Sequence, residues 1–96
     1  MNLILSGKIK MQKEKINIQK ITDFVDKTLL IVDDDGPLRD RLSRAMENKG
    51  FQVTQAESVK QGISKAKNAP PAFAVVDLRL GDGNGLQVVE EIRKIK

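Results

Sequence analysis

The sequence predicts an α/β domain built on a doubly wound parallel sheet. Apolar runs that suit strands alternate with longer stretches of helical periodicity, so that each run is followed by one such stretch. Two of the runs, residues 29–32 and 73–76, are apolar without interruption, as expected for central strands buried on both faces. Both runs end in aspartate, at the edge where open α/β sheets build their sites.

Residues 1–27 are interpreted as a basic N-terminal extension. They carry six lysines and three acids, whereas residues 28–96 carry eleven basic and ten acidic residues, so the basic excess is weak support for nucleic-acid binding by the domain. The apolar start at 3–5 is too short for a signal peptide, and no run approaches the roughly 20 residues of a membrane span. We expect a flexible or weakly helical leader at 1–27 and a domain at 28–96.

The first strand is expected at Thr28–Asp33, and a helix follows it. Pro37 suits the first helical position, and Asp35 or Gly36 can cap the helix. Residues 48–50 end it, with a glycine that is free to adopt the left-handed conformation. The expected apolar face of this helix consists of Leu38, Leu42, Ala45 and Met46.

An alternating stretch at 51–56 predicts an edge strand that is buried on one face. Residues 58–61 match a capping box at the start of a second helix, and residues 68–71 end that helix. A third strand is expected at Phe73–Leu78, followed by a glycine-rich loop and a final helix to about Lys94. The glycines of this loop are Gly81, Gly83 and Gly85.

The two fully apolar strands should be central neighbours, with the alternating strand beside the first, which gives the strand order 2-1-3. Right-handed crossovers then place the first two helices on opposite faces and open a crevice at the carboxyl ends of strands one and three. Asp33, Asp34 and Asp77 lie at those ends. The outer edge of the third strand would have no partner, which proteins avoid, so we expect a chain that is cut short or that depends on a partner strand.

The chain has no cysteine and no histidine, which excludes disulfides, thiol nucleophiles, the usual zinc sites and imidazole catalysis. Three clustered carboxylates stay ionised only beside a cation, and Mg²⁺ with its preference for oxygen ligands fits best. Asp77, which stands alone, is assigned as a phosphoryl acceptor, and Asp34 as a metal ligand with support from Asp33. Asp35 is expected to cap its helix, and the backbone carbonyl of Arg79 to complete the metal shell.

Three segments resemble the receiver domain of bacterial two-component response regulators, namely LLIVDDDGPLRDRL, GFQVTQAES and VVDLRLGDGNGLQVVEEIR. The resemblance covers about residues 28–96. It rests on an acidic pair after strand one, the single Asp77 after strand three, and Gly85 eight residues beyond it. It implies a flavodoxin-like (receiver) fold of which the first three βα units are present and the last two are missing. The stretch DLRLGDGNGL looks most like redox-responsive regulators of the photosynthesis-control type.

The resemblance implies a phosphorelay acceptor rather than an enzyme that turns over an external substrate. A sensor histidine kinase would donate its phosphoryl group to Asp77, with Mg²⁺ bound by Asp34, Asp77 and the Arg79 carbonyl, and with Asp33 assisting. The full-length protein would control transcription in the cytoplasm, with receiver–receiver dimers as a further expected contact. DNA would be contacted only by an output domain that this sequence does not contain, and no membrane contact is expected. The family's Ser or Thr on strand four and Lys on strand five match no residue of this sequence.

Two other interpretations stay open. Residues 30–36 also resemble the opening motif of haloacid-dehalogenase-type phosphatases, in which Asp33 would be the nucleophile and Asp35 the acid–base. Pro37, however, stands where that motif has Thr. The third interpretation is a receiver-like fragment that takes no phosphate and acts only by pairing its exposed edge with a partner. A phosphoryl adduct lost on Asp77→Asn would indicate the receiver, and one lost on Asp33→Asn the phosphatase.

Overall fold

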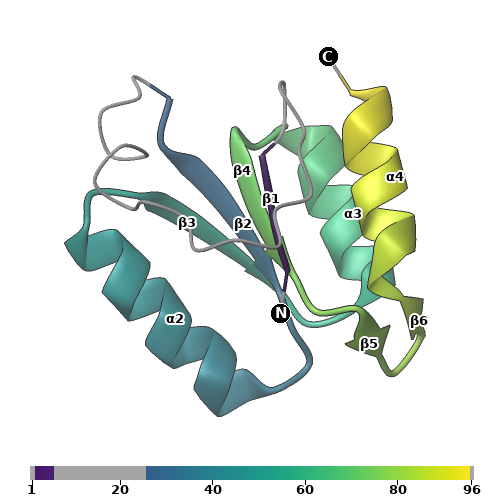
Figure 1. Cartoon of the computed structure of the whole chain (residues 1–96), viewed down its shortest axis with the longest axis horizontal. Helices are drawn as coiled ribbons and strands as arrows, with labels where there is room; N and C mark the ends of the chain where they lie inside the picture. Colours follow the sequence, from purple (N-terminus) through teal and green to yellow (C-terminus); the bar gives the residue numbers. More distant parts are fainter. Residues whose placement is uncertain (1, 6–25, 96) are drawn as a thin grey trace.

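The computed structural model of the chain describes residues 2–5 and 26–95 (Figure 1). The described helices pack against a four-stranded sheet, and a short two-stranded hairpin lies between the last strand of this sheet and the last helix. In chain order the elements are β1 (Asn2–Leu5), β2 (Thr28–Val32), α2 (Gly36–Asn48), β3 (Gln52–Ala56), α3 (Val59–Asn68), β4 (Phe73–Val76), β5 (Arg79–Leu80), β6 (Gly83–Asn84) and α4 (Gly85–Lys94).

The main sheet has the strand order β1-β4-β2-β3, in which β2 pairs in parallel with both β3 and β4. The order 2-1-3 expected for the three parallel strands is therefore confirmed. Val32 aligns with Ala56 on one side and with Val76 on the other. The ladder continues for one more residue, because Asp77 N donates to Val32 O at 2.9 Å and Asp33 N donates to Ala56 O at 3.0 Å. The carboxyl ends of β2 and β4 are thus level, which brings their aspartates to the same edge.

Successive residues of β2 supply two different cores, as the unbroken apolar run predicts. Leu30 and Val32 pack with residues of α3 and α4, whereas Leu29 and Ile31 pack with residues of α2. Figure 1 shows α2 on one face of the sheet and the neighbouring helices α3 and α4 on the other. Helices on both faces of a parallel sheet confirm the doubly wound class.

Side chains fix where the helices begin. Asp35 caps α2 and Ser58 caps α3, both as expected, by accepting bonds from backbone N–H groups of the first turn at 3.0 and 3.1 Å. The capping box predicted at α3 is half formed, because Gln61 accepts from the backbone N–H of the residue before Ser58. Asn84 and Gln87 form a complete capping box at α4, which was not predicted although the two residues have the spacing of this motif in the sequence.

The N-terminal leader differs from expectation at its start. Residues 2–5, expected to be flexible or weakly helical, form strand β1, which pairs antiparallel with β4. The pairing depends on the edge of β4, which lies about seventy residues away in the sequence, so no local periodicity could indicate it. The rest of the expected leader up to residue 25 lies outside the described residues.

Two helix faces also differ from the predicted apolar pattern. On α2, Ala45 is exposed, whereas Ser43 is buried. Ser43 can be buried because its hydroxyl donates a hydrogen bond to the carbonyl of Arg39 at 2.8 Å. On α4, Leu86 is 39% exposed, whereas Val88, Val89 and Ile92 enter the core as expected. Leu86 lies in the first turn of α4, directly after Gly85, which packs against the end of β4.

Candidate functional site

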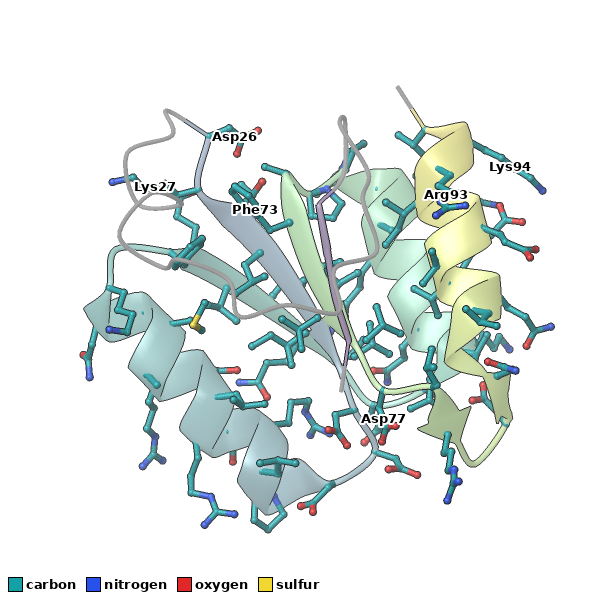
Figure 2. All side chains as sticks on the ribbon, in the orientation of Figure 1. Asp26, Lys27, Phe73, Asp77, Arg93 and Lys94 are labelled. Carbon is teal, nitrogen blue, oxygen red and sulfur yellow. The ribbon has the colours of Figure 1, made fainter. Side chains whose placement is uncertain are left out.

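Three aspartates meet at the carboxyl ends of β2 and β4. Asp33 and Asp34 follow β2, Asp77 follows β4, and one carboxylate oxygen from each lies within 4.8 Å of the others. The parallel register of the two strands produces this meeting, since it sets Val32 opposite Val76. Figure 2 shows Asp77 at the end of β4 opposite to Phe73, in a group of carboxylates.

Asp33 is the one charged residue that is buried in the described part of the chain, with 2% of its surface exposed. Its Oδ1 accepts from the backbone N–H of Asp35 at 2.9 Å, which orients the carboxylate at the turn between β2 and α2. Asp34 is exposed and Asp77 is half-buried. The three acids therefore differ in burial, since Asp33 is buried, Asp77 is half-buried and Asp34 is exposed to solvent.

The guanidinium of Arg39 holds the same turn from the side of α2. Its Nη1 donates to the Asp33 carbonyl at 2.7 Å, and its Nε donates to Gln55 Oε1 at 2.9 Å. Arg39 thus links the end of β2 to β3 and brings a positive charge to the backbone beside the acidic cluster. Arg39 lies outside the apolar face expected for this helix, and the sequence analysis gave it no role. The usable signal was an arginine one turn into a helix that follows an acidic strand end.

The backbone turns back immediately after Asp77. Arg79 N donates to Asp77 Oδ1 at 3.0 Å, so one carboxylate oxygen is held by the chain that follows it. The Arg79 side chain is exposed. Its backbone carbonyl as a metal ligand stays a prediction.

Gly85 lies against the end of β4 more closely than any other residue type could. A Cβ at this position would lie 2.1 Å from the Asp77 carbonyl oxygen, and Gly85 N donates to the Leu78 carbonyl at 3.1 Å. Gly85 was predicted as a loop turn; the structure shows a close backbone approach at the first position of α4. The lack of a side chain allows α4 to begin directly beside the residue that carries the carboxylate.

Asp82 fastens the other end of this loop. Its two carboxylate oxygens accept from the N–H groups of Val59 at 2.8 Å and Lys60 at 3.1 Å, at the start of α3. These backbone hydrogen bonds, the one from Val59 foremost, hold the pKa of Asp82 below its ordinary value. The sequence indicated only that position 82 lies in a glycine-rich loop, because nothing local indicates a partner more than twenty residues away.

The donor set fits a hard divalent cation. Each acid of the cluster offers a carboxylate oxygen, and magnesium is bound in proteins through one or two carboxylates with water completing its shell. Asp35, in contrast, has its Oδ1 occupied by the N–H of Leu38 at the start of α2. The phosphatase interpretation needs Asp35 as an acid–base beside Asp33. The use of the Asp35 carboxylate as a helix cap therefore argues against this interpretation.

A family model described as the response regulator receiver domain matches residues 29–96. The chain belongs to this family. The resemblance stated from the sequence is thus confirmed, and membership favours the receiver interpretation over the phosphatase interpretation. Among the described helices of this receiver domain, none is long and apolar enough to cross a membrane.

Named regulators resemble the receiver domain closely. It is 65% identical over 68 residues to the acid tolerance regulatory protein ActR of Sinorhizobium medicae, covering 71% of this chain and 35% of ActR. It is 56% identical over 69 residues to the photosynthetic apparatus regulatory protein RegA of Cereibacter sphaeroides, covering 72% of this chain and 38% of RegA. The likeness to photosynthesis-control regulators is therefore confirmed. The chain spans between a third and two fifths of the length of these relatives.

Proposed function

We propose that the chain is a phosphoacceptor receiver domain in which Asp77 takes a phosphoryl group from the phosphohistidine of a sensor histidine kinase. The observation that carries this proposal is the meeting of three carboxylates within 4.8 Å at the ends of two neighbouring parallel strands. Asp33, Asp34, Asp77 and the Arg79 carbonyl would hold Mg²⁺. When bound, this ion would neutralise charge on the transferring phosphoryl group.

The three acids are suited to different roles. Asp77 is half-buried and has one oxygen held by Arg79 N, which leaves the carboxylate fixed in direction for attack on phosphorus. In the transfer, a carboxylate oxygen of Asp77 forms a bond to phosphorus. The bond from phosphorus to the histidine nitrogen breaks, and the nitrogen keeps the electron pair. The product is an acyl phosphate on Asp77.

Phosphorylation with a small-molecule donor tests this assignment without the kinase. With acetyl phosphate and Mg²⁺, intact mass spectrometry should show an adduct of about 80 Da, the mass of one phosphoryl group on a carboxylate. Asp77→Asn should remove the adduct. Asp40→Asn, which removes an exposed acid of α2, is the matched control and should keep it.

Other outcomes of this experiment would point elsewhere. An adduct that survives Asp77→Asn and disappears in Asp33→Asn would support a phosphatase-type nucleophile. A chain that takes no adduct and binds no Mg²⁺ would be an interaction-only receiver. Chelation of Mg²⁺ with EDTA should abolish phosphorylation if the cluster acts with the cation as proposed.

The relatives' names suggest a regulatory setting for the acceptor. ActR is named for acid tolerance and RegA for regulation of the photosynthetic apparatus. We infer that a protein with this receiver domain controls transcription in response to a cognate sensor kinase in the cytoplasm. Contact with DNA would come from an output domain, and contact between two receiver domains would accompany phosphorylation.

A further inference from the structure

The chain that follows Asp77 folds back on itself as the β5–β6 hairpin. Its strands are Arg79–Leu80 and Gly83–Asn84, with Gly81 and Asp82 at the tip. A Cβ at Gly81 would meet no heavy atom within 4 Å, so nothing packs against this side of the tip. Glycine loses more conformational freedom on folding than other residues, and a hairpin this short is not stable alone. The hairpin therefore needs a contact with the rest of the domain that holds it in place.

Asp82 makes such a contact with the first turn of α3. Its Oδ1 accepts from Val59 N at 2.8 Å, and its Oδ2 accepts from Lys60 N at 3.1 Å. The N-cap residue Ser58 accepts from the next N–H along the helix, that of Gln61. Asp82 thus binds two N–H groups that the helix's own cap does not bind, across more than twenty residues of sequence. Figure 1 shows the hairpin next to the start of α3.

The same hairpin carries the backbone group that meets the Asp77 carboxylate. Arg79 N donates to Asp77 Oδ1 at 3.0 Å, and Arg79 lies three positions before Asp82. Between them, Leu80 is 8% exposed and belongs to the core cluster that also contains Val59. Arg79 is therefore followed at once by a buried side chain and, at the tip, by a carboxylate bonded to α3.

We propose that Asp82 is a positioning residue of the acceptor site, whose contact with α3 holds Arg79 against the Asp77 carboxylate and keeps the Arg79 carbonyl available to Mg²⁺. The part that concerns Mg²⁺ rests on the phosphoacceptor function proposed above. Asp82 acts through Arg79 and not as a ligand, because both of its carboxylate oxygens are bonded to α3. Without this contact Arg79 would spend less time in the required position, and the apparent affinity for Mg²⁺ would fall by that fraction.

Amide hydrogen exchange of the full chain tests the contact without Mg²⁺ or a phosphoryl donor. Asp82→Ala removes both acceptor oxygens, and we expect exchange of the Arg79 amide to become about tenfold faster, the effect of about one lost hydrogen bond. Ser58→Ala is the matched control, because it removes an N–H partner from the same turn of α3 but none from the hairpin. Exchange of the Arg79 amide should stay near the wild-type rate in this control.

Two results of the exchange experiment would overturn the proposal. One is an unchanged rate for the Arg79 amide in Asp82→Ala. The other is an equal acceleration in Ser58→Ala, because a less stable α3 would then explain the effect without any tie to the hairpin.

Asp82→Asn separates the hydrogen bonds from the charge. Asn and Ala both remove the negative charge, but Asn keeps one acceptor oxygen for one of the two N–H groups. Exchange of the Arg79 amide in Asp82→Asn should therefore lie between the rates of the wild type and Asp82→Ala. Equal rates in the two variants would overturn the proposal, because loss of the charge alone would account for them. Should Asp82→Ala fail to fold, faster exchange in Asp82→Asn than in Ser58→Ala supports the proposal, and equal rates overturn it.

Titration calorimetry with Mg²⁺ measures the consequence for the proposed function. The dissociation constant should rise by about tenfold in Asp82→Ala and stay near the wild-type value in Ser58→Ala. Equal affinity in the wild type and Asp82→Ala would overturn the role of Asp82 in metal binding. A wild type that binds no Mg²⁺ and takes no phosphoryl group would instead overturn the phosphoacceptor function, while exchange of the Arg79 amide would still decide whether Asp82 holds Arg79. The two proposals can thus fail separately.

Discussion

At the scale of single residues, Gly85 sets how closely α4 approaches the end of β4. We predict that Gly85→Ala lowers the free energy of unfolding by about 2 kcal/mol, since its Cβ would lie 2.1 Å from the Asp77 carbonyl oxygen and the backbone must shift. The same shift should move the Asp77 carboxylate and slow its phosphorylation by acetyl phosphate. Urea unfolding and intact mass measure the two effects.

Gly81→Ala is the matched control. A Cβ at Gly81 would meet no heavy atom within 4 Å, and Gly81 does not have a positive φ. We therefore expect a change in the free energy of unfolding within about 0.5 kcal/mol. Equal destabilisation by the two substitutions would show that loop flexibility, and not the contact with Asp77, accounts for the effect.

The sequence indicated the acids of the site but not the groups that hold them. Asp33, Asp34 and Asp77 each follow an uninterrupted apolar run, and the topology rules for parallel sheets bring such ends together. Asp82 could not be found in this way, because its partners lie on α3, more than twenty residues away in the sequence. Arg39 is different, because its bond to the Asp33 carbonyl joins residues only six apart. The ligand role of Arg79 and the acceptor role of Asp77 stay predictions.

At the scale of secondary-structure elements, Asp82 ties the turn between β5 and β6 to the start of α3. Backbone hydrogen bonds lower the pKa of Asp82 below its ordinary value of 3.8. Its folded-state pKa is thus below that of the unfolded chain, so its contribution to stability is complete above about pH 4 and is lost as the pH falls through the folded-state pKa. We predict that Asp82→Asn lowers stability at neutral pH and weakens the loss of stability in acid.

Urea unfolding of the wild type and Asp82→Asn between neutral pH and pH 3 measures this difference. The comparison is needed because hydrogen bonds from Thr28 to Asp26 and from Lys94 to Glu91 also lower the pKa values of those acids and act in the same direction. The wild type and Asp82→Asn both keep these groups, so the difference between their unfolding free energies at each pH reports on Asp82 alone. Parallel stability curves for the two proteins would contradict its role as a titrating cap.

The elements were predictable to different degrees for physical reasons. The strands β2 and β4 were indicated by unbroken apolar runs, which are typical of strands buried on both faces. The helices α2, α3 and α4 were indicated by the periodic spacing of their apolar residues and by residues that begin or end a helix. The β5–β6 hairpin was missed, because two strands of two residues have no period to detect and its glycines suggested only a loop. β1 was missed because its partner is an edge created by the rest of the fold.

At the scale of the whole molecule, the acidic cluster lowers the stability of the fold when no cation is bound, although the same carboxylates would bind the cation that the proposed function needs. Three carboxylates that approach within 4.8 Å at one edge of the sheet repel one another when no cation is bound. Asp33 is buried, so bulk solvent screens its charge less than it screens an exposed charge. The folded chain therefore holds a repulsion that a bound cation would turn into attraction, and which variant is most stable should depend on Mg²⁺.

We predict that Asp34→Asn is more stable than the wild type in EDTA and less stable in excess Mg²⁺. Without the cation, the variant loses one of three like charges. With Mg²⁺ at a hundred times its Kd, the wild type should gain about 2.7 kcal/mol of unfolding free energy by linkage, whereas the variant binds more weakly and gains less. Urea unfolding in the two conditions measures the reversal, and Asp40→Asn should follow the wild type in both. An equal gain in unfolding free energy for the wild type and Asp34→Asn would show that Asp34 does not bind the ion. A residue that binds Mg²⁺ raises the affinity of the folded state for the ion, so its loss must reduce the stabilisation that Mg²⁺ provides.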